Sequence, residues 1–289
     1  MENQADEISL KDIADALLAR RWLIVLMTIG FAIGGAAVAF LLPEKYEASI
    51  VLSPVDDSAG GKLGGAGSLL SQFGGLAALG GINVGGSGKK AEAIATLQSH
   101  GLTENFIRDN NLLPILYADK WDAERKAWKT QDPEEVPTVW KAEKKFAKKI
   151  RSIGEDKKTG LVTLTIEWTD AELAAQWAKD LVDRANRDLR AREIKQSQTN
   201  LAYLNDQLTK TSVVELQKAI YSLIEAEIKK VMIANGSDEF AFRVVDPPRI
   251  AEERSSPKRG LIVAVGLFLG FMLGVVLALS LPARNNGHR

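Results

Sequence analysis

Cysteine is absent from the 289-residue chain, and histidine occurs only twice. Without cysteine the chain forms no disulfide, no thiolate metal site and no cysteine nucleophile. A surplus of charge of either sign is also missing, because 37 basic residues balance 37 acidic ones. A chain without net charge gives no reason to expect nucleic acid as a partner.

Sequence motifs of catalysis are lacking as well. His100 lies in a helical pattern and His288 lies near the C-terminus, so neither belongs to a metal-binding or Ser-His-Asp pattern. The acidic pairs Asp56-Asp57 and Asp119 with Asp122 fall in predicted loops. A glycosidase pair of carboxylates is the alternative for them, but acidic residues in loops are usually solvated. We therefore predict no catalytic residue, no metal site, no cofactor and no enzymatic activity.

Apolar residues are concentrated in two runs without a charged residue, Trp22 to Leu42 and Leu261 to Leu281. Each would form a helix of roughly 31 Å, which matches the hydrocarbon core of a bilayer. Inside lipid such a run must be helical to satisfy its backbone amides. A cleaved signal peptide is the alternative for the first run, since 37–39 resembles a cleavage site, although the apolar run continues to Leu42. We expect two membrane-spanning helices, 22–42 and 261–281.

The two spans set the predicted domain organisation. Arg20 and Arg21 precede the first span, which places residues 1–21 in the cytoplasm as an N-terminal segment and 282–289 there as a tail. Residues 43–260 then form one large domain outside the cytoplasm. Within it, 58–88 is a glycine-rich segment whose composition is typical of a flexible linker, although its large apolar residues favour packing of a part of it.

Glycines recur at helical spacing in both spans. Gly266, Gly270 and Gly274 share one face of the second span, and Gly30 and Gly34 share one face of the first. Small faces allow the backbones of membrane helices to approach closely. Packing between the two spans of one chain and packing with another subunit or a partner protein are equally compatible with this spacing.

In the large domain, residues 46–52 and 161–168 alternate apolar and polar side chains, which predicts two strands. Residues 89–110 have helical spacing. Trp121, Trp128 and Trp140 punctuate a lysine-rich stretch. Sugar stacking is one interpretation, but we favour packing residues on a helix.

The most informative soluble segment is a 39-residue run without glycine or proline, Ala171 to Thr209. It predicts a helix about 58 Å long, opened by a capping box of Thr169 and Glu172. A break near 209–212 precedes a second helical pattern, 213–234, and 240–245 would then return to the sheet. A helix of this length needs a partner along it.

The region before and inside the second span resembles a proline/glycine motif of the polysaccharide co-polymerases, the Wzz-type chain length determinants. We write the motif as Pro-x2-Pro-x4-Ser-Pro-Lys-x11-Gly-Gly-Met-x-Gly-Ala-Gly. The residues in register here are Pro248, Ser256, Pro257, Lys258, Gly270, Met272 and Gly274. The sequence departs from it at Ala251, Phe271, Val275 and Val276. Residues 111–116, 120–123 and 239–247 also resemble the family, so the resemblance covers nearly the whole chain.

The resemblance implies an α+β membrane protein of the Gram-negative inner membrane. Two transmembrane helices would flank a periplasmic domain with a small membrane-proximal sheet and a long projecting helical hairpin. It also implies a ring-shaped homo-oligomer that contacts membrane lipids, the O-antigen polymerase and the growing lipid-linked polysaccharide. Such a scaffold sets the modal chain length of lipopolysaccharide O-antigen. The glycines named above with Met272 would make packing or partner contacts, and Pro248 to Lys258 would form a juxtamembrane motif.

Two other functions remain open on this basis. One is an adaptor for exopolysaccharide or capsule export, and the other is a membrane-anchored polysaccharide hydrolase. We do not expect the branch of the family that couples to a cytoplasmic tyrosine kinase, because 282–289 holds no kinase domain and no tyrosine cluster.

Overall fold

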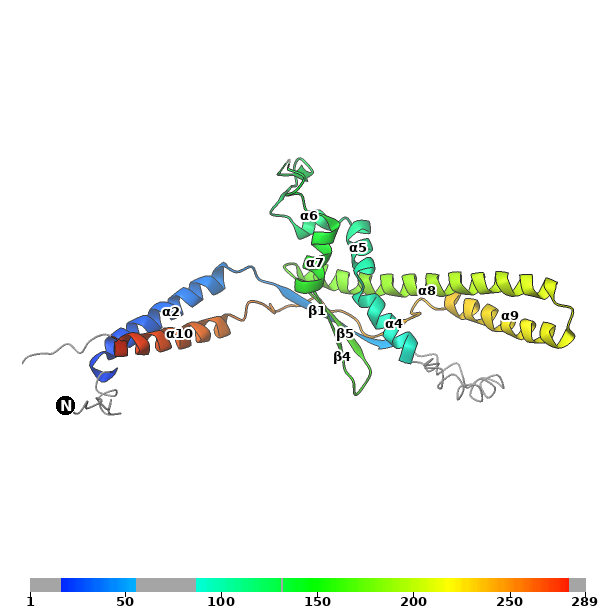
Figure 1. The fold of residues 1–289 in the computed structure, drawn as a ribbon. Helices are drawn as coiled ribbons and strands as arrows, with labels where there is room; N and C mark the ends of the chain where they lie inside the picture. The colour runs from blue at the N-terminus through cyan, green and yellow to red at the C-terminus, as the bar shows by residue number, and fades with distance from the viewer. Residues whose placement is uncertain (1–16, 56–86, 131, 281–289) are drawn as a thin grey trace, which may run out of the picture. The chain divides into compact units, whose positions relative to one another are not determined.

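The structure, a computed structural model, describes residues 17–55, 87–130 and 132–280 (Figure 1). The chain divides into two compact units. The helix pair comprises the described residues up to Tyr46 together with those from Glu253 onward, and the large unit comprises Glu47–Glu252. Three predicted stretches lie wholly or mostly outside the described residues. They are residues 1–16 of the N-terminal segment, residues up to 86 of the glycine-rich segment 58–88, and the tail 282–289.

The helix pair consists of α2 (Arg21–Leu41) and α10 (Arg259–Ser280). In the described part of the chain these two helices are long and apolar enough to cross a membrane. Their bounds lie within two residues of the predicted spans. Contacts between the helices pair the end of one with the start of the other, from Gly35 beside Ile262 to Gly274 beside Ile24, so the two helices are antiparallel.

The large unit is built on a four-stranded sheet with the order β4-β5-β1-β6. Its strands are β1 (Tyr46–Pro54), β4 (Arg151–Glu155), β5 (Val162–Trp168) and β6 (Phe242–Asp246). The pairs β4–β5 and β1–β6 are antiparallel. Alternate side chains of the two inner strands are buried, as the sequence pattern predicts, and they are Ala48, Ile50, Leu52, Val162, Leu164 and Ile166.

Helices α4 (Ser87–Gln98), α5 (His100–Asp109), α7 (Val139–Lys149) and the first half of α8 (Ala171–Lys210) supply the rest of the core. Phe106, Phe146, Trp177 and Trp168 form a chain of aromatic contacts with ring centroids 5.2–5.9 Å apart. The aromatic rings thereby join α5, α7, α8 and β5 around one core.

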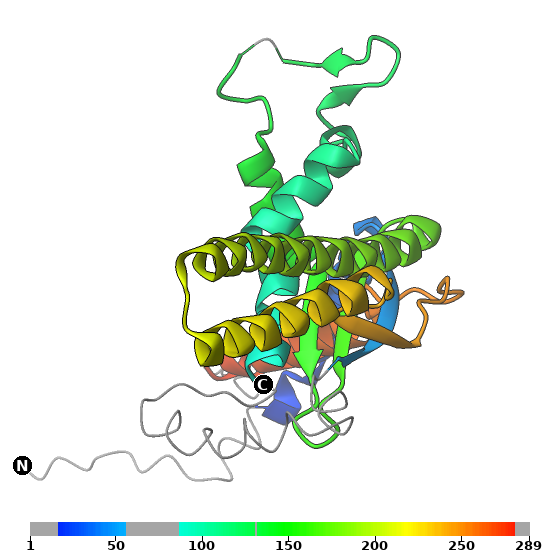
Figure 2. The same ribbon diagram turned by 90° about the vertical axis from the view of Figure 1, so that its right-hand side faces the viewer.

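The long helix α8 has 40 residues, close to the predicted run. The predicted capping box of Thr169 and Glu172 is wrong, because the side chain of Asp170 caps the helix by accepting the backbone N–H groups of Glu172 and Leu173 at 2.9 and 3.0 Å. After Thr211 the chain turns into α9 (Val214–Asn235), which runs back beside the second half of α8 (Figure 2). We call the second half of α8 together with α9 the hairpin.

Two further expectations are corrected. The predicted helix 89–110 is divided at Ser99, whose hydroxyl accepts the N–H of Leu102 and so begins a second helix. Trp121 and Trp128 do not lie on a helix. They face each other across the short strands β2 (Trp121–Asp122) and β3 (Ala127–Trp128), with ring centroids 4.9 Å apart. Between α5 and this strand pair lies the four-residue helix α6 (Leu113–Leu116).

Candidate functional site

Three glycines of α10 lie directly against α2. A Cβ atom on Gly266 would lie 2.8 Å from the carbonyl oxygen of Phe31, and one on Gly270 would lie 2.7 Å from the Cβ of Phe31. A Cβ on Gly274 would lie 3.0 Å from the Cα of Ile24. Any side chain at the first two positions would therefore force the helices apart. The structure places all three glycines between the two apolar helices of one chain, and we call this contact the glycine seam.

Gly30 and Gly34 lie elsewhere. A Cβ added to either residue would meet nothing within 4 Å, so both face away from α10. Their neighbour Gly35, which was not among the predicted packing residues, faces the seam instead, and a Cβ on it would lie 3.3 Å from the carbonyl oxygen of Ile262. The side chain of Met272 is about half exposed. The predicted packing residues thus divide into an internal group and an open group.

A polar cluster joins the chain just after α2 to the chain just before α10. Glu44 accepts hydrogen bonds from Arg254 at 3.0 Å and from Arg259 at 2.8 Å. The guanidinium of Arg259 also lies 4.3 Å from the ring centroid of Phe40. The backbone N–H of Lys45 donates to the carbonyl of Ser256 at 2.9 Å. We call these residues the juxtamembrane clamp.

The predicted juxtamembrane motif overlaps this clamp only in part. Ser256 bridges to Lys45, and Pro257 follows it through a cis peptide bond. The carbonyl of Lys258 accepts the N–H of Leu261 at the start of α10. Pro248 belongs to the large unit, in the extended stretch after β6. The charged residues of the clamp were missed, although a glutamate just beyond one span and arginines just before the other are a usable signal for such a pairing.

The contact between the two helices of the hairpin contains both apolar and polar side chains. Ile220 and Ala234 are the buried residues of α9, and Ser197 is buried on the second half of α8. Glu227 lies between the helices and accepts hydrogen bonds from Asn200 at 3.3 Å and Lys230 at 2.9 Å. Burial alone would raise the pKa of Glu227, but the hydrogen bonds from Lys230, Ser197 and Asn200 hold it below its ordinary value.

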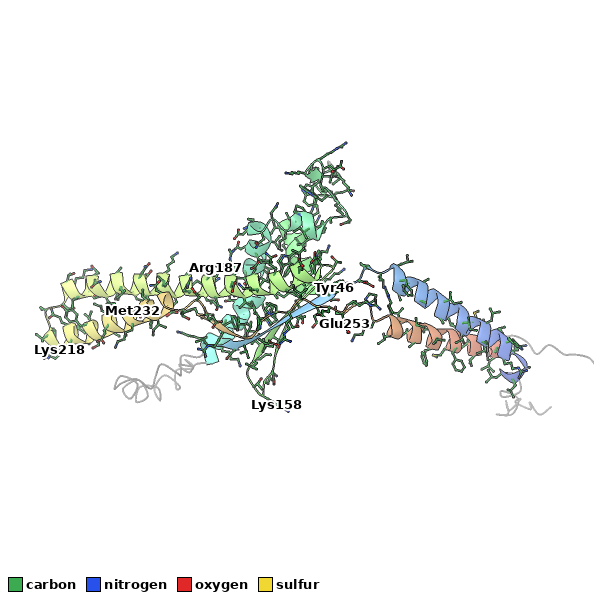
Figure 3. All side chains as sticks on the ribbon, turned by 180° about the vertical axis from the view of Figure 1, so that it is seen from behind. Tyr46, Lys158, Arg187, Lys218, Met232 and Glu253 are labelled. Atoms are coloured by element: carbon green, nitrogen blue, oxygen red, sulfur yellow. The ribbon has the colours of Figure 1, made fainter. Side chains whose placement is uncertain are left out.

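Large apolar side chains are exposed on α9, and Met232, labelled in Figure 3, is one of them. Successive positions turn by about 100° around a helix, which places most of these residues on two separate stripes. One stripe carries Val214, Tyr221, Ile228 and Met232, and the other carries Leu216 and Leu223. Met232 is 68% exposed and its neighbour Ile233 is 67% exposed. Large apolar side chains that gather in this way on exposed faces are typical of an interaction surface.

Asn186 fixes the root of the hairpin. Its amide group is buried, and it donates to the carbonyl of Phe242 at 3.0 Å. Its carbonyl oxygen accepts the backbone N–H groups of Ala241 and Phe242 at 2.9 and 2.8 Å. One side chain of α8 thereby holds the chain that returns from α9 into β6. Nothing in the spacing of the sequence distinguishes Asn186 from the apolar residues around it.

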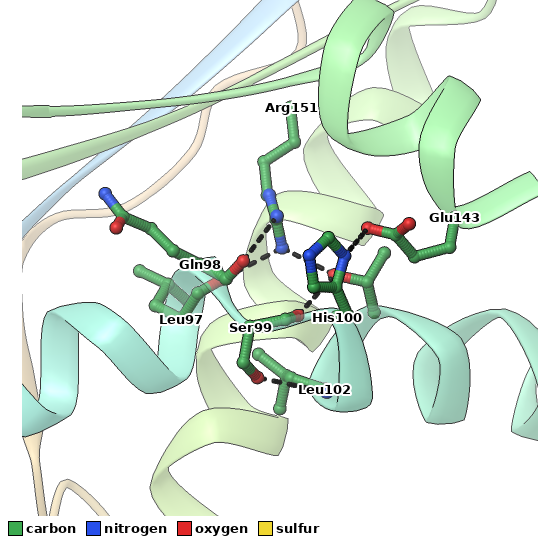
Figure 4. A network of polar contacts seen from close by, with 8 residues as sticks. Leu97, Gln98, Ser99, His100, Leu102, Glu143 and Arg151 are labelled. Carbon is green, nitrogen blue, oxygen red and sulfur yellow. Dashed lines mark hydrogen bonds and ion pairs between the residues drawn. The ribbon is translucent and has the colours of Figure 1, made fainter. Parts of the chain in front are cut away.

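A second buried polar cluster lies at the junction of α4 and α5 (Figure 4). Arg151 donates to the carbonyls of Leu97 and Gln98 at 2.9 and 3.0 Å and to the hydroxyl of Thr103 at 2.6 Å. Burial lowers the pKa of Arg151, and the nearby carboxylate of Glu143 opposes that shift. These bonds satisfy the carbonyl groups at the end of α4, so the cluster has a structural role.

His100 belongs to the edge of this cluster. Its Nδ1 lies 2.8 Å from the Oε1 of Glu143, a pairing across 43 positions that the sequence does not indicate. The neighbouring hydroxyl of Thr103 donates to the carbonyl of Ser99. The hydroxyl proton of Thr103 therefore bonds to the helix backbone. This hydroxyl is not free to be activated as a nucleophile by His100 and Glu143.

The acidic pair Asp119 and Asp122 has a local role as well. The carboxylate of Asp122 accepts the N–H groups of Glu124 and Arg125, which fixes the turn after β2. Asp56 and Asp57 lie outside the described residues. Among residues 17–55, 87–130 and 132–280, no group of three or more acidic or histidine side chains could hold a metal ion.

Two family models match the chain. The Wzz model, "Chain length determinant protein", matches residues 6–110, and the GNVR model, "G-rich domain on putative tyrosine kinase", matches residues 204–282. No curated protein sequence matches the chain.

Two solved structures are similar at low identity. A "full-length bacterial polysaccharide co-polymerase" is 12% identical, with 94% of this chain and 96% of that chain covered at a TM-score of 0.39. A fragment of WzzB, a polysaccharide co-polymerase from Salmonella Typhimurium, is 12% identical, with 74% of this chain and 100% of the fragment covered at a TM-score of 0.27. The GNVR match takes in residues 239–247 and the motif from Pro248 to Gly274, which carry the resemblance read from the sequence. Residues 111–116 and 120–123, which also resemble the family, lie outside both matches. The chain thus carries a Wzz chain length determinant domain over residues 6–110 and a GNVR domain over residues 204–282.

Proposed function

We propose that this protein is a non-catalytic regulator that sets the modal length of lipopolysaccharide O-antigen. It would do so as an oligomeric scaffold for the membrane polymerase. The match of residues 6–110 to the chain length determinant model supports the regulatory role. The observation that carries the scaffold is the exposed apolar surface on both flanks of α9.

The two stripes of α9 differ in sequence, and this difference bears on the kind of assembly. A contact between unlike surfaces of identical subunits is heterologous, and it closes into a ring when the rotation between subunits allows closure. The stripe with Tyr221 and Ile228 on one copy would lie against the stripe with Leu216 and Leu223 on the next. A homo-oligomeric ring therefore uses both exposed stripes at once.

We place the protein in the Gram-negative inner membrane, with both termini in the cytoplasm and residues 43–260 in the periplasm. The length and apolar character of α2 and α10 support the two spans. Arg20 and Arg21 at the start of the first span support the orientation.

Contacts within the membrane would follow the division of the glycines. The seam glycines 266, 270 and 274 hold the two helices of one chain together. Gly30, Gly34 and Met272 remain open to lipid, a second subunit or the polymerase. The juxtamembrane clamp and the lead-in from Pro248 to Lys258 would keep the two spans in fixed register while a partner binds.

The decisive experiment is deletion of the gene followed by electrophoresis of the cell's lipopolysaccharide. We expect polymer to form still, but with its preferred length lost and the distribution broadened. Restoration of the preferred length by the wild-type chain is the control. Complete loss of polymer would contradict a purely regulatory role, and an unchanged ladder would exclude O-antigen as the polysaccharide concerned.

One specific observation favours a second function, an adaptor for exopolysaccharide or capsule export. The GNVR model matches the hairpin and the second span, and its description places that domain on a tyrosine kinase. In that case deletion would reduce the amount of exported polysaccharide and leave the lipopolysaccharide ladder unchanged. The same deletion strain therefore separates the two functions.

A further inference from the structure

A cavity of about 400 Å³ lies at the root of the hairpin, within the large unit. It is bounded by α4, by α8, by the loop after α9 and by the first residues of β6. Leu189 and Ala241 are buried beneath it, and Phe240 lies partly exposed beside them. The floor of this hairpin-root cavity is therefore apolar.

The rim of the cavity carries charges of both signs. Glu92 and Glu193 contribute carboxylates, and Arg192 and Arg243 contribute guanidinium groups. Within the described part of the chain, the side chains of these four residues form no hydrogen bond and no ion pair. Arg190, close by on α8, differs because it is paired with Asp238 at 2.9 Å. The rim thus offers two acceptors and two donors that the fold itself does not use.

The balance of charge selects the chemistry of a ligand. Lys89 and Glu239 also line the cavity, so three basic and three acidic side chains surround it. A lining with this balance neither attracts nor excludes an ion of either sign strongly. It is suited to a neutral ligand with many hydroxyl groups, because carboxylates accept and guanidinium groups donate hydrogen bonds. An apolar floor with an aromatic edge suits the C–H face of a sugar ring. A volume of about 400 Å³ falls in the lower part of the usual range for ligand pockets, enough for one or two sugar units.

We propose that the hairpin-root cavity binds one or two sugar units of the growing glycan. Glu92 and Glu193 accept hydrogen bonds from sugar hydroxyls, Arg192 and Arg243 donate to ring and hydroxyl oxygens, and Phe240 packs against the apolar face of a ring. The inference rests on the proposed function in one respect, since that function supplies a glycan near the protein. It adds that the chain holds the glycan directly.

The test uses the full chain in lipid nanodiscs and isothermal titration with an oligosaccharide of two repeat units, released from the host's own surface polysaccharide. We expect saturable binding to the wild-type chain. Arg192→Gln and Glu193→Gln should each weaken it about tenfold, as expected for loss of a hydrogen bond to a charged group. The matched control is Arg187→Gln. Arg187 is exposed on the same helix and does not line the cavity, so this variant should bind like the wild type.

Thermal unfolding of each variant shows that the fold is retained, which is expected because Arg192 is exposed and Glu193 half-buried. Absence of binding to the wild-type chain would overturn the inference. Equal weakening by Arg192→Gln and Arg187→Gln would overturn it too, because the cavity would then not be the site. In either case a broadened lipopolysaccharide ladder in the deletion strain would leave the proposed function standing. An unchanged ladder with cavity-dependent binding would remove the proposed function alone.

Discussion

The helix pair and the hairpin are both pairs of antiparallel helices, but their contacts are of opposite kinds. In the helix pair, α10 presents glycines, and the backbones meet at distances where a Cβ atom would not fit. In the hairpin, side chains separate the two helices, with Ile220 and Ala234 buried and a polar group around Glu227 between them. The helix pair is therefore held by close backbone approach, and the hairpin is held by side-chain contacts.

The exposed apolar side chains of the two regions consequently have different meanings. On α2 and α10 they are the expected surface of helices in lipid, where exposure of leucine or phenylalanine costs nothing. On α9 the same exposure would face water, where apolar surface of this extent is unfavourable unless another surface covers it. Among residues 17–55, 87–130 and 132–280, nothing covers these apolar side chains of α9, whereas those of α2 and α10 need no cover in lipid.

The largest effect is expected at the root of the hairpin. Asn186→Leu keeps the approximate shape of the side chain but leaves two N–H groups and one carbonyl of residues 241 and 242 buried without a partner. We expect the free energy of unfolding of the large unit to fall by about 3 kcal/mol. Urea unfolding of the full chain in detergent, followed by fluorescence of the buried Trp177, measures the change.

Asn205→Leu is the matched control, because Asn205 lies on the same helix and is exposed. Its effect should stay within about 0.5 kcal/mol. If the two variants unfolded at the same urea concentration, Asn186 would not hold the root of the hairpin.

The next effect breaks the glycine seam. Gly270→Ala places a methyl group 2.7 Å from the Cβ of Phe31, and overpacking of this kind costs about 1–3 kcal/mol. Gly274→Ala should cost less, because its closest contact is 3.0 Å, and Gly30→Ala should cost nothing in the pair because its Cβ meets open space. Hydrogen exchange of α2 and α10 in detergent micelles measures the loss. A ranking other than 270, 274, 30 would contradict the seam.

The sequence predicts both apolar helices, strands β1 and β5, and the length of α8 well, because each depends on a local pattern. An uncharged run of this length matches the thickness of a bilayer, alternation indicates a strand, and a long run without glycine or proline permits one helix. Strand β4 was missed, because Arg151 to Glu155 shows no apolar alternation and is defined by its pairing with β5. The break at Ser99 was missed for a similar reason, since a single hydroxyl cap decides it.

The candidate sites were less predictable than the fold. The spacing of Gly266, Gly270 and Gly274 indicates a close contact but not its partner, and only the structure assigns it to α2. The same spacing at Gly30 and Gly34 leads to a face without a partner in the described chain. Asn186 and the pairing of His100 with Glu143 join positions far apart in sequence, and no periodicity records such pairs.

A smaller effect on folding, but a distinct one on assembly, is expected on the flank of α9. Tyr221→Gln combined with Ile228→Gln removes two exposed apolar side chains from one stripe. The stability of the single chain should change by less than about 0.5 kcal/mol. The concentration at which the oligomer dissociates should rise about tenfold or more. Light scattering coupled to size exclusion in detergent measures it.

Lys218→Gln with Lys229→Gln on the same helix is the matched control. Both side chains are exposed, and helical spacing places them between the two apolar stripes rather than on either one. The control should assemble like the wild type. Unchanged assembly of the Tyr221 and Ile228 variant would show that this stripe is not covered by another copy.

The smallest expected effect is on the pH dependence of unfolding, and it distinguishes the hairpin from the helix pair most directly. The pKa of Glu227 in the folded hairpin lies below its ordinary value, so its carboxylate stabilises the hairpin above the ordinary pKa of about 4.3. That contribution is lost as the pH falls through the lowered folded pKa. Glu227→Gln should therefore remove part of the acid dependence of unfolding, whereas Glu225→Gln at an exposed pair with Lys229 should remove less. The contacts of the glycine seam include no titratable group, so exchange around Gly266, Gly270 and Gly274, away from the clamp carboxylate of Glu44, should show no matching step. Acid curves for Glu227→Gln that coincide with the wild type would show that the polar contact does not hold the hairpin.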